Sequence, residues 1–366
     1  MLSTFGIILI ICLLIQCIYY CTFWYGLNQI PDTQPSNSKE PVSVIITAKN
    51  EASNLDNLIS VLFEQEYPAF EVILVDDCSE DQSQKLLDQL QQDYKNFKVI
   101  TIRQVPMGIN SKKYALMKGI EQAQHDLLLF TDADCLPESR QWIAKMAAAA
   151  QGKEIVLGFS DYFQKRGLLN YFIRFETLLT ALQYLGLAHT YRPYMGVGRN
   201  LAYRKSFFYQ QGGFNGFEFV TGGDDDLFVN KNASSMNFAL AAGNGSNTIS
   251  YPHSRLKNFY RQKTRHLGAS RHYRWFDKII LGAFSLTYML SWLLLPAALI
   301  TDNELYIVLG SFCLRTLLLY ITLTVLIKKL NILFSLAGLV ALDLIYSFYL
   351  LITGFAAFFT KRVSWN

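Results

Sequence analysis

The chain has 366 residues, of which 51% are hydrophobic and only 17% are charged. This charged fraction is low for a soluble protein, and the length allows one large domain or two small ones. The net charge of +4 comes partly from basic residues beside an apolar segment, so it gives no support to a nucleic-acid partner. The six cysteines form no CxxC motif, which fits reduced thiols in the cytoplasm rather than a disulfide framework.

The first 31 residues predict an N-terminal transmembrane anchor. The stretch from Phe5 to Tyr25 is almost wholly apolar, and about 20 such residues cross a bilayer. A cleaved signal peptide fits less well, because the start lacks basic residues and no small-residue cleavage site follows.

Residues 32–278 predict an α/β domain that begins with a polar linker. Strands are expected at 42–46, 70–75, 97–102 and 126–130, and helices at 51–65, 81–92 and 111–123, from apolar runs and helical spacing. This alternation implies right-handed crossovers and a parallel sheet. Asp76-Asp77 and Asp132-Ala133-Asp134 follow the second and fourth strands, so both are expected at the ligand-binding edge of the sheet. Neither GxGxxG nor a P-loop is present, which removes support for dinucleotide and Walker-type binding.

The pattern is looser after residue 151. The segment Gly167 to Leu187 is rich in Leu, Phe and Tyr, and fits either a helix at the membrane surface or one that covers the sheet. Residues 191–223 are rich in Gly, Tyr and Phe, which suggests loops around an active site. A second acidic cluster, Asp224-Asp225-Asp226, follows them.

Residues 279–366 predict a C-terminal membrane region of about three spans. Apolar stretches run over 279–301, 305–327 and 332–359, and Pro296 is expected to kink or end the first of them. The second and third contain one charged residue each, Arg315 and Asp343, which we expect to pair across two helices because charges in the membrane interior are costly. Basic residues flank 32–278 on both sides and place this domain in the cytoplasm. The protein is thus expected to be an integral membrane protein of the bacterial inner (cell) membrane.

Four motifs in order resemble those of the family 2 glycosyltransferases with a GT-A fold, of the membrane-bound processive type. The motifs are Val75-Asp76-Asp77-Cys78-Ser79, Asp132-Ala133-Asp134, Gly223-Asp224-Asp225-Asp226-Leu227 and Gln262-Lys263-Thr264-Arg265-His266. The resemblance covers residues 40–275 and implies a GT-A, Rossmann-like, mostly parallel mixed sheet flanked by transmembrane helices. His266 stands where the family usually has Trp, which puts acceptor stacking and polymer synthesis in doubt.

The resemblance implies a role for each motif on the nucleotide-sugar donor. Asp77 would accept a hydrogen bond from uracil and Glu51 would lie near the ribose or base, while Lys112 would contact the nucleotide and Lys113 would be its solvated neighbour. Asp134 and Asp132 would hold Mg²⁺ or Mn²⁺, which prefer oxygen ligands, with Asp132 also near the sugar. Arg265 and Gln262 would bind the donor diphosphate; the fork of a guanidinium suits phosphate.

The second acidic cluster resembles the family's source of the catalytic base. Asp225 is favoured over Asp224 as the base that takes the acceptor proton, and Asp226 is expected to cap the next helix. The three adjacent carboxylates should repel one another and raise the pKa of at least one.

The resulting expectation is an inverting, metal-assisted transferase that moves a sugar from a UDP-sugar to a lipid or glycan acceptor at the cytoplasmic membrane face. A polyprenyl-phosphate sugar transferase with the same donor site is the alternative enzyme. A non-catalytic membrane scaffold with a transferase fold is the alternative from another class.

Overall fold

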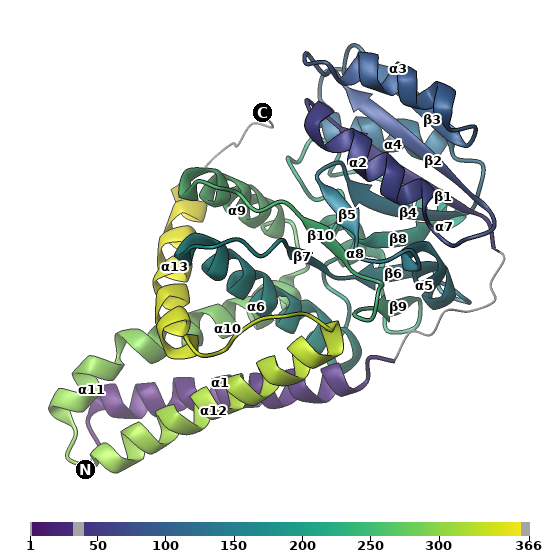
Figure 1. Cartoon of the computed structure of the whole chain (residues 1–366). Coiled ribbons are helices and arrows are strands. Elements are labelled where there is room, and N and C mark those ends of the chain that lie inside the picture. Colours follow the sequence, from purple (N-terminus) through teal and green to yellow (C-terminus); the bar gives the residue numbers. More distant parts are fainter. Residues whose placement is uncertain (1, 32–39, 360–366) are drawn as a thin grey trace.

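The computed structural model describes residues 2–31 and 40–359, without the side chains of 356–359. A seven-stranded mixed sheet lies at its centre, in the order β3-β2-β1-β4-β8-β6-β9 (Figure 1). The strands are β1 (Val42–Ala48), β2 (Phe70–Asp77), β3 (Phe97–Ile102), β4 (Leu127–Asp132), β6 (Ile155–Gly158), β8 (Leu201–Arg204) and β9 (Phe238–Ala241). All neighbouring pairs are parallel except those of β8, which is antiparallel to β4 and β6. A smaller sheet joins β5 (Cys135–Pro137), β10 (Thr248–Ser250) and β7 (Ser160–Tyr162).

Helices cover both faces of the large sheet, because the buried strands present apolar side chains alternately to each side. Val44 and Ile46 pack in one core with α2 (Ala52–Phe63), α3 (Ser83–Asp93) and α5 (Trp142–Ala149). Ile45 packs in the other core with α4 (Ser111–Gln122) and α6 (Leu168–Thr190). The predicted α/β fold and its first seven elements are therefore confirmed.

The register of the parallel strands brings the first motifs together. Ala48 of β1 pairs with Asp76 of β2, and Thr47 pairs with Asp132 of β4. The carboxylates that follow β2 and β4 thus flank the end of β1, as expected for the edge of a parallel sheet at which ligands bind.

The segments after residue 151 are more regular than their sequence indicates. α6 is buried along most of its length, between the sheet and α1 (Thr4–Asn28): the Tyr184 hydroxyl donates to the Gly158 carbonyl at 2.8 Å, and Gly186 meets Gly26 of α1. It therefore covers the sheet, the second of the two alternatives that its sequence left open. The region 191–223 is not all loop, because β8 and α7 (Lys205–Gln210) lie within it.

The remaining helices extend away from the sheet. α1 and α12 (Leu305–Leu330) are each long and apolar enough to cross a membrane. α10 (Trp275–Leu293) and α11 (Leu295–Thr301) meet at an angle of 46°, beside Pro296, and could form one broken span or a re-entrant loop. α13 (Leu339–Phe359) runs across the direction of α1 and α12 (Figure 1), and residues 332–338 before it are not helical. The division into an anchor, a cytoplasmic domain and three C-terminal spans stays a prediction.

The charged pair expected in the C-terminal region is confirmed. The Arg315 guanidinium contacts the Asp343 carboxylate, and both side chains are fully buried. Asp343 also accepts hydrogen bonds from the Tyr288 hydroxyl and the Trp292 indole. Three helices, α10, α12 and α13, therefore meet at this carboxylate.

Candidate active site

Two adjoining cavities lie at the edge of the sheet where β1, β2 and β4 end. The outer cavity is lined by Thr47, Lys49, Asn50, Glu51, Glu80, Ala133, Asp134, His253, Asn258 and Arg261. The inner cavity is lined by the acidic cluster, by residues 195–199, and by parts of β7, α6 and α9 (Leu256–Ser270). Lys112, Asp132, Gln262 and Arg265 line both, so a ligand in the outer cavity can reach into the inner one.

The two acidic motifs are joined by one ammonium group. Lys112 Nζ, at the start of α4, lies 2.8 Å from Asp132 Oδ1 and 3.3 Å from Asp224 Oδ2. Burial would lower the pKa of Lys112, but Asp132 and Asp224 raise it, so the group stays charged. Burial would likewise raise the pKa of Asp224, yet Lys112 and Lys113 bring it below its usual value.

Lys113 is not the solvated neighbour that the sequence suggested. It is fully buried, and its ammonium donates to the carbonyls of Val220 (2.5 Å) and Gly222. It therefore holds the glycine-containing loop that leads into the acidic cluster, because α4 places consecutive lysines on different sides of the helix.

Asp225 is the carboxylate at the start of α8 (Asp226–Asn232). It occupies the N-cap, and its two oxygens accept from the backbone N–H groups of Asp226 (2.7 Å) and Gly198 (2.6 Å). The expectation that Asp226 caps this helix is therefore wrong. With three consecutive aspartates, the sequence does not show which of them is the N-cap. Burial, followed by the charge of Asp224, raises the pKa of Asp225.

The Asp226 side chain instead points into the protein interior. Its carboxylate accepts from the Tyr273 hydroxyl at 2.8 Å and from the Leu227 N–H at 2.7 Å. Burial first, and then the charge of Asp225, raises the pKa of Asp226 to about 8. The predicted repulsion within the cluster thus falls on Asp225 and Asp226, while lysines offset it at Asp224.

The predicted metal ligands lie in the outer cavity. Burial and the neighbouring charge of Asp132 raise the pKa of Asp134, and His253 lines the same cavity. Within the described residues no three His, Cys, Asp or Glu side chains lie close enough to hold an ion alone. Asp132 and Asp134 nevertheless offer the hard oxygen ligands of Mg²⁺ or Mn²⁺, which usually takes further oxygens from substrate phosphates.

Two predicted donor residues occupy different positions. Glu51 lines the outer cavity, where burial raises its pKa and Asn54 donates to it at 2.6 Å. Asp77 does not line the cavities: it is buried behind their wall, with Oδ2 accepting from the Ser111 hydroxyl at 2.6 Å. Its Oδ1 has no partner within the described part of the chain, so an acceptor oxygen is left for an N–H donor.

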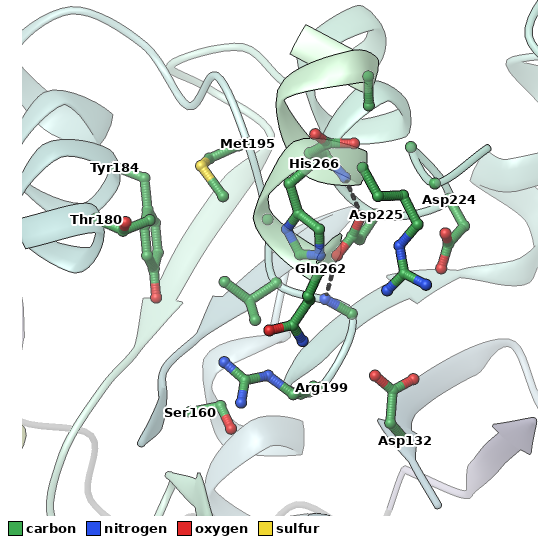
Figure 2. A pocket seen from close by; sticks show the side chains of 18 of the residues that line it. Asp132, Ser160, Thr180, Tyr184, Met195, Arg199, Asp224, Asp225, Gln262 and His266 are labelled. Atoms are coloured by element: carbon green, nitrogen blue, oxygen red, sulfur yellow. Dashed lines mark hydrogen bonds between the residues drawn. The ribbon is translucent and has the colours of Figure 1, made fainter. Parts of the chain in front are cut away.

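The inner cavity is lined partly by residues 195–199, which belong to the glycine-containing segment 194–200 that the sequence suggests as a site loop near the donor or acceptor. Ser160, Thr180 and Tyr184 also line it, and the sequence did not single these out. Gln262 and His266 project from α9 toward Arg199, with Thr180, Tyr184 and Met195 on one side and Asp132 and Asp224 on the other (Figure 2). The Arg199 guanidinium lies 4.5 Å from the centre of the Tyr162 ring. No sequence pattern indicates this contact, because it joins β7 to a loop more than thirty residues away.

Comparisons with known proteins agree with this geometry. Residues 43–214 match the family model for glycosyl transferase family 2, and residues 130–360 match that for glycosyl transferase family group 2. Glycosyltransferase AglE of Haloferax volcanii is 31% identical over 118 residues, which are 32% of this chain and 37% of that protein. The undecaprenyl-phosphate 4-deoxy-4-formamido-L-arabinose transferase of Proteus mirabilis is 34% identical over 121 residues, covering 31% and 35%. The matches thus span little more than a third of these relatives.

A solved structure extends the likeness to the whole fold. The mannosyltransferase PcManGT from Pyrobaculum calidifontis, in complex with GDP-Man and Mn²⁺, superposes with a TM-score of 0.63 at 17% identity, covering 98% of this chain and 100% of that one. At this identity the likeness concerns the fold alone. With the family models, which together match residues 43–360, it establishes that the chain belongs to the family 2 glycosyltransferases and has the GT-A fold.

Proposed function

We propose that the protein is an inverting glycosyltransferase that moves a sugar from a UDP-sugar to a lipid or glycan acceptor at the cytoplasmic face of a membrane. The observation that carries the proposal is the pair of adjoining cavities, with one carboxylate motif in each and four shared residues between them. A donor in the outer cavity would place its sugar at the shared residues. An acceptor in the inner cavity would then meet the anomeric carbon beside Asp225.

The residues of the outer cavity would bind and orient the donor. Glu51 would lie near the ribose or base, and Lys112 and Arg265 would hold the diphosphate. Asp134 and Asp132 would hold Mg²⁺ or Mn²⁺, and the bound cation would supply Lewis-acid stabilisation of the leaving UDP. Asp132 already pairs with Lys112, so these residues hold compensating charges before the donor binds.

Asp225 would act as the general base. Its carboxylate would take the proton of the acceptor hydroxyl as that oxygen forms a bond to the anomeric carbon and the bond from this carbon to the UDP oxygen breaks. The backbone N–H groups of Gly198 and Asp226 fix the carboxylate in place. Attack from the face opposite the leaving group inverts the anomeric configuration.

The test is release of nucleoside diphosphate by the full-length protein in detergent. UDP- and GDP-sugars are supplied with Mn²⁺ or Mg²⁺ and with lipid and glycan acceptors. Asp225→Asn is expected to lower kcat by about 10²–10⁴-fold, with the exposed Asp93→Asn as the matched control. Absence of release from every donor and acceptor would overturn the proposal. A loss of only a few-fold in Asp225→Asn would favour an acceptor, such as a polyprenyl phosphate, that needs no base.

A further inference from the structure

Arg199 has no direct ion-pair partner in the described part of the chain. Burial would lower its pKa, but neighbouring groups, Asp134 and Asp132 among them, raise it above its usual value. Its guanidinium makes no hydrogen bond and lies within 4.0 Å of no carboxylate in residues 2–31 and 40–359, and its Nη1 is buried without a partner. By contrast, Lys112 pairs with two aspartates, and Lys263 lies 2.5 Å from Glu176. The buried Nη1 is therefore a donor that an acceptor oxygen of a ligand would satisfy.

Ser160 supplies a second unsatisfied group beside it. This residue of β7 lines the inner cavity and is 2% exposed, and its hydroxyl has no partner in the part of the chain that the structure describes. Figure 2 shows the Arg199 guanidinium extending toward Ser160. Two unpaired donors therefore lie at one end of the inner cavity, and oxygens of an anion would satisfy both.

His266 lines the same cavity, beside several cationic side chains. Burial first, and then the charges of Arg265, Lys263 and Arg199, lower the pKa of His266 well below its usual value. The imidazole is therefore neutral at pH 7, and can donate or accept a hydrogen bond without adding charge.

The cavity that Arg199 lines favours an anion on the acceptor side of the site, although the charges of Asp134 and Asp132 also act on Arg199. Arg199 and Ser160 line the inner cavity but not the outer one, where Lys49, His253 and Arg261 provide separate groups for donor phosphates. Arg199 also directly follows Gly198, whose N–H binds Asp225. The group held by Arg199 thus lies next to the attacking oxygen.

We propose that Arg199 and Ser160 form a phosphate subsite, and that the acceptor is a lipid carrying a phosphate group. This inference rests on the proposed transferase function for its biological meaning, but the subsite can be tested by binding alone. Tyr184 and Met195, on the side of the cavity away from Asp132 and Asp224 (Figure 2), offer a less polar surface to the rest of the acceptor. This surface belongs partly to α6, which packs against the apolar helix α1.

The experiment compares ligands that differ only in the phosphate. Binding of farnesyl phosphate and farnesol to the full-length protein in detergent is measured by calorimetry, for the native chain and for Arg199→Gln, Arg199→Lys and Ser160→Ala. The native chain is expected to bind the phosphate about 10- to 100-fold more tightly than the alcohol, as for hydrogen bonds to a charged group. Arg199→Gln should remove most of this preference, and Arg199→Lys should retain part of it because its charge remains.

A matched variant in the outer cavity separates the two sites. Arg261→Gln is expected to keep the preference for farnesyl phosphate, since Arg261 lines only the outer cavity. Equal binding of the two ligands, or a preference that persists in Arg199→Gln, would overturn the proposal. The proposal would also be overturned if Arg261→Gln lost the preference and Arg199→Gln retained it. That result would assign the anion to the donor site.

Two acceptor pairs identify the source of the phosphate. Transfer to polyprenyl phosphate is compared with transfer to polyprenol, and transfer to phosphatidylglycerol with transfer to diacylglycerol. Preference for the first member of either pair, lost in Arg199→Gln, supports the subsite and tells a monoester from a diester. A monoester attacks through its own phosphate oxygen and needs no base, so with that acceptor Asp225→Asn is expected to lower kcat only a few-fold. Equal transfer to both members counts against the subsite. Failure of all donors to react would refute the transferase proposal. The phosphate subsite would still be decided by the binding of farnesyl phosphate, which needs no transfer.

Discussion

At the scale of single residues, three neighbouring aspartates have three different environments. Asp224 faces two lysines, Asp225 is bound by two backbone N–H groups, and Asp226 is bound by a buried tyrosine. The pKa of Asp224 is therefore below its usual value, while those of Asp225 and Asp226 are above it. One cluster can thus hold an ionised carboxylate beside a protonated one, a separation that suits acid–base work.

Asp226 gives a prediction on stability against pH. Its pKa of about 8 in the folded protein exceeds the value of about 3.9 in an unfolded chain. The unfolded state therefore releases this proton first, and the stability that Asp226 contributes is lost as the pH rises from about 4 to about 8. The new side chain in the Asp226→Asn variant stays neutral at every pH. The unfolding midpoint of this variant, relative to that of the native chain, should therefore rise as the pH increases through this window and stay constant above it. Thermal unfolding in detergent at pH 5 to 9, without added metal, measures this difference.

The exposed Asp93 at the end of α3 provides the control. Asp93→Asn is expected to change the midpoint by the same small amount at each pH. A difference between Asp226→Asn and the native chain that does not change between pH 5 and pH 8 would show that Asp226 titrates as an ordinary aspartate.

The sequence predicted the residues whose chemistry is local. Asp132, Asp134 and the triple aspartate are recognisable because they form short motifs. Lys112, Gln262 and Arg265 line the shared part of the two cavities. Arg199 lies in the segment 194–200 that the sequence suggests as a site loop, but its contacts, Ser160 and the Tyr273–Asp226 bond could not be predicted. Their partners come from elements distant in sequence, and only the tertiary packing shows which polar groups are satisfied.

At the scale of elements, α1 and α6 approach each other through two glycines. A Cβ at Gly26 would lie 2.0 Å from the carbonyl oxygen of Gly186, and a Cβ at Gly186 would lie 2.9 Å from Phe23. Backbones this close require small residues, which is common where apolar helices pack together. This contact joins the N-terminal helix to the helix that forms one wall of the inner cavity.

Gly26→Ala is therefore expected to force the two helices apart. Overpacking of this kind costs about 1–3 kcal/mol, and it should lower the midpoint of thermal unfolding in detergent. Gly282→Ala is the matched control, because Gly282 lies in α10 where the space that an added methyl group would occupy is open. That variant should be neutral or more stable by up to about 1 kcal/mol, since Ala favours the helix. Equal midpoints for both variants would show that the α1–α6 contact can relax.

The elements that could be predicted are those with a clear period. β1 to β4 and the helices between them follow from apolar runs and turn residues. β6, β8, β9 and β10 have four residues or fewer, and such short strands are defined by their neighbours more than by their own sequence. β8 in particular is held between β4 and β6, so its place in the sheet depends on residues far from it in the chain.

At the scale of the whole molecule, buried polar contacts join the acidic cluster to the apolar helices. Asp277, at the start of α10, is 1% exposed and accepts from Asn230 of α8 at 2.7 Å and from Arg192 at 3.0 Å. Tyr273, just before α10, binds Asp226. α8 is thus bonded both to α10 and to the turn just before it, so a displacement of α10 would also displace the carboxylate of Asp226 in α8.

The pair of Arg315 and Asp343 gives the last prediction, on assembly of the apolar helices. Arg315→Met and Asp343→Asn should each lower the yield of monodisperse protein after detergent extraction. Removal of one partner leaves the other buried and unpaired, which costs about 3–5 kcal/mol. The double variant should recover most of the yield, because Met carries no charge and Asn can still accept from Tyr288 and Trp292, which now bind Asp343. Size-exclusion chromatography of extracts measures the yield.

A charge swap, Arg315→Asp with Asp343→Arg, restores the pair but not its surroundings. The Trp292 indole N–H can only donate, so it would face the donors of an arginine at position 343. The swapped chain should therefore recover less than the neutral double variant and more than either single variant. If each single variant extracted as well as the native chain, the pair would not hold α12 and α13 together. If the swap matched the native chain, pairing of the charges alone would suffice, and the bonds from α10 to Asp343 would contribute little.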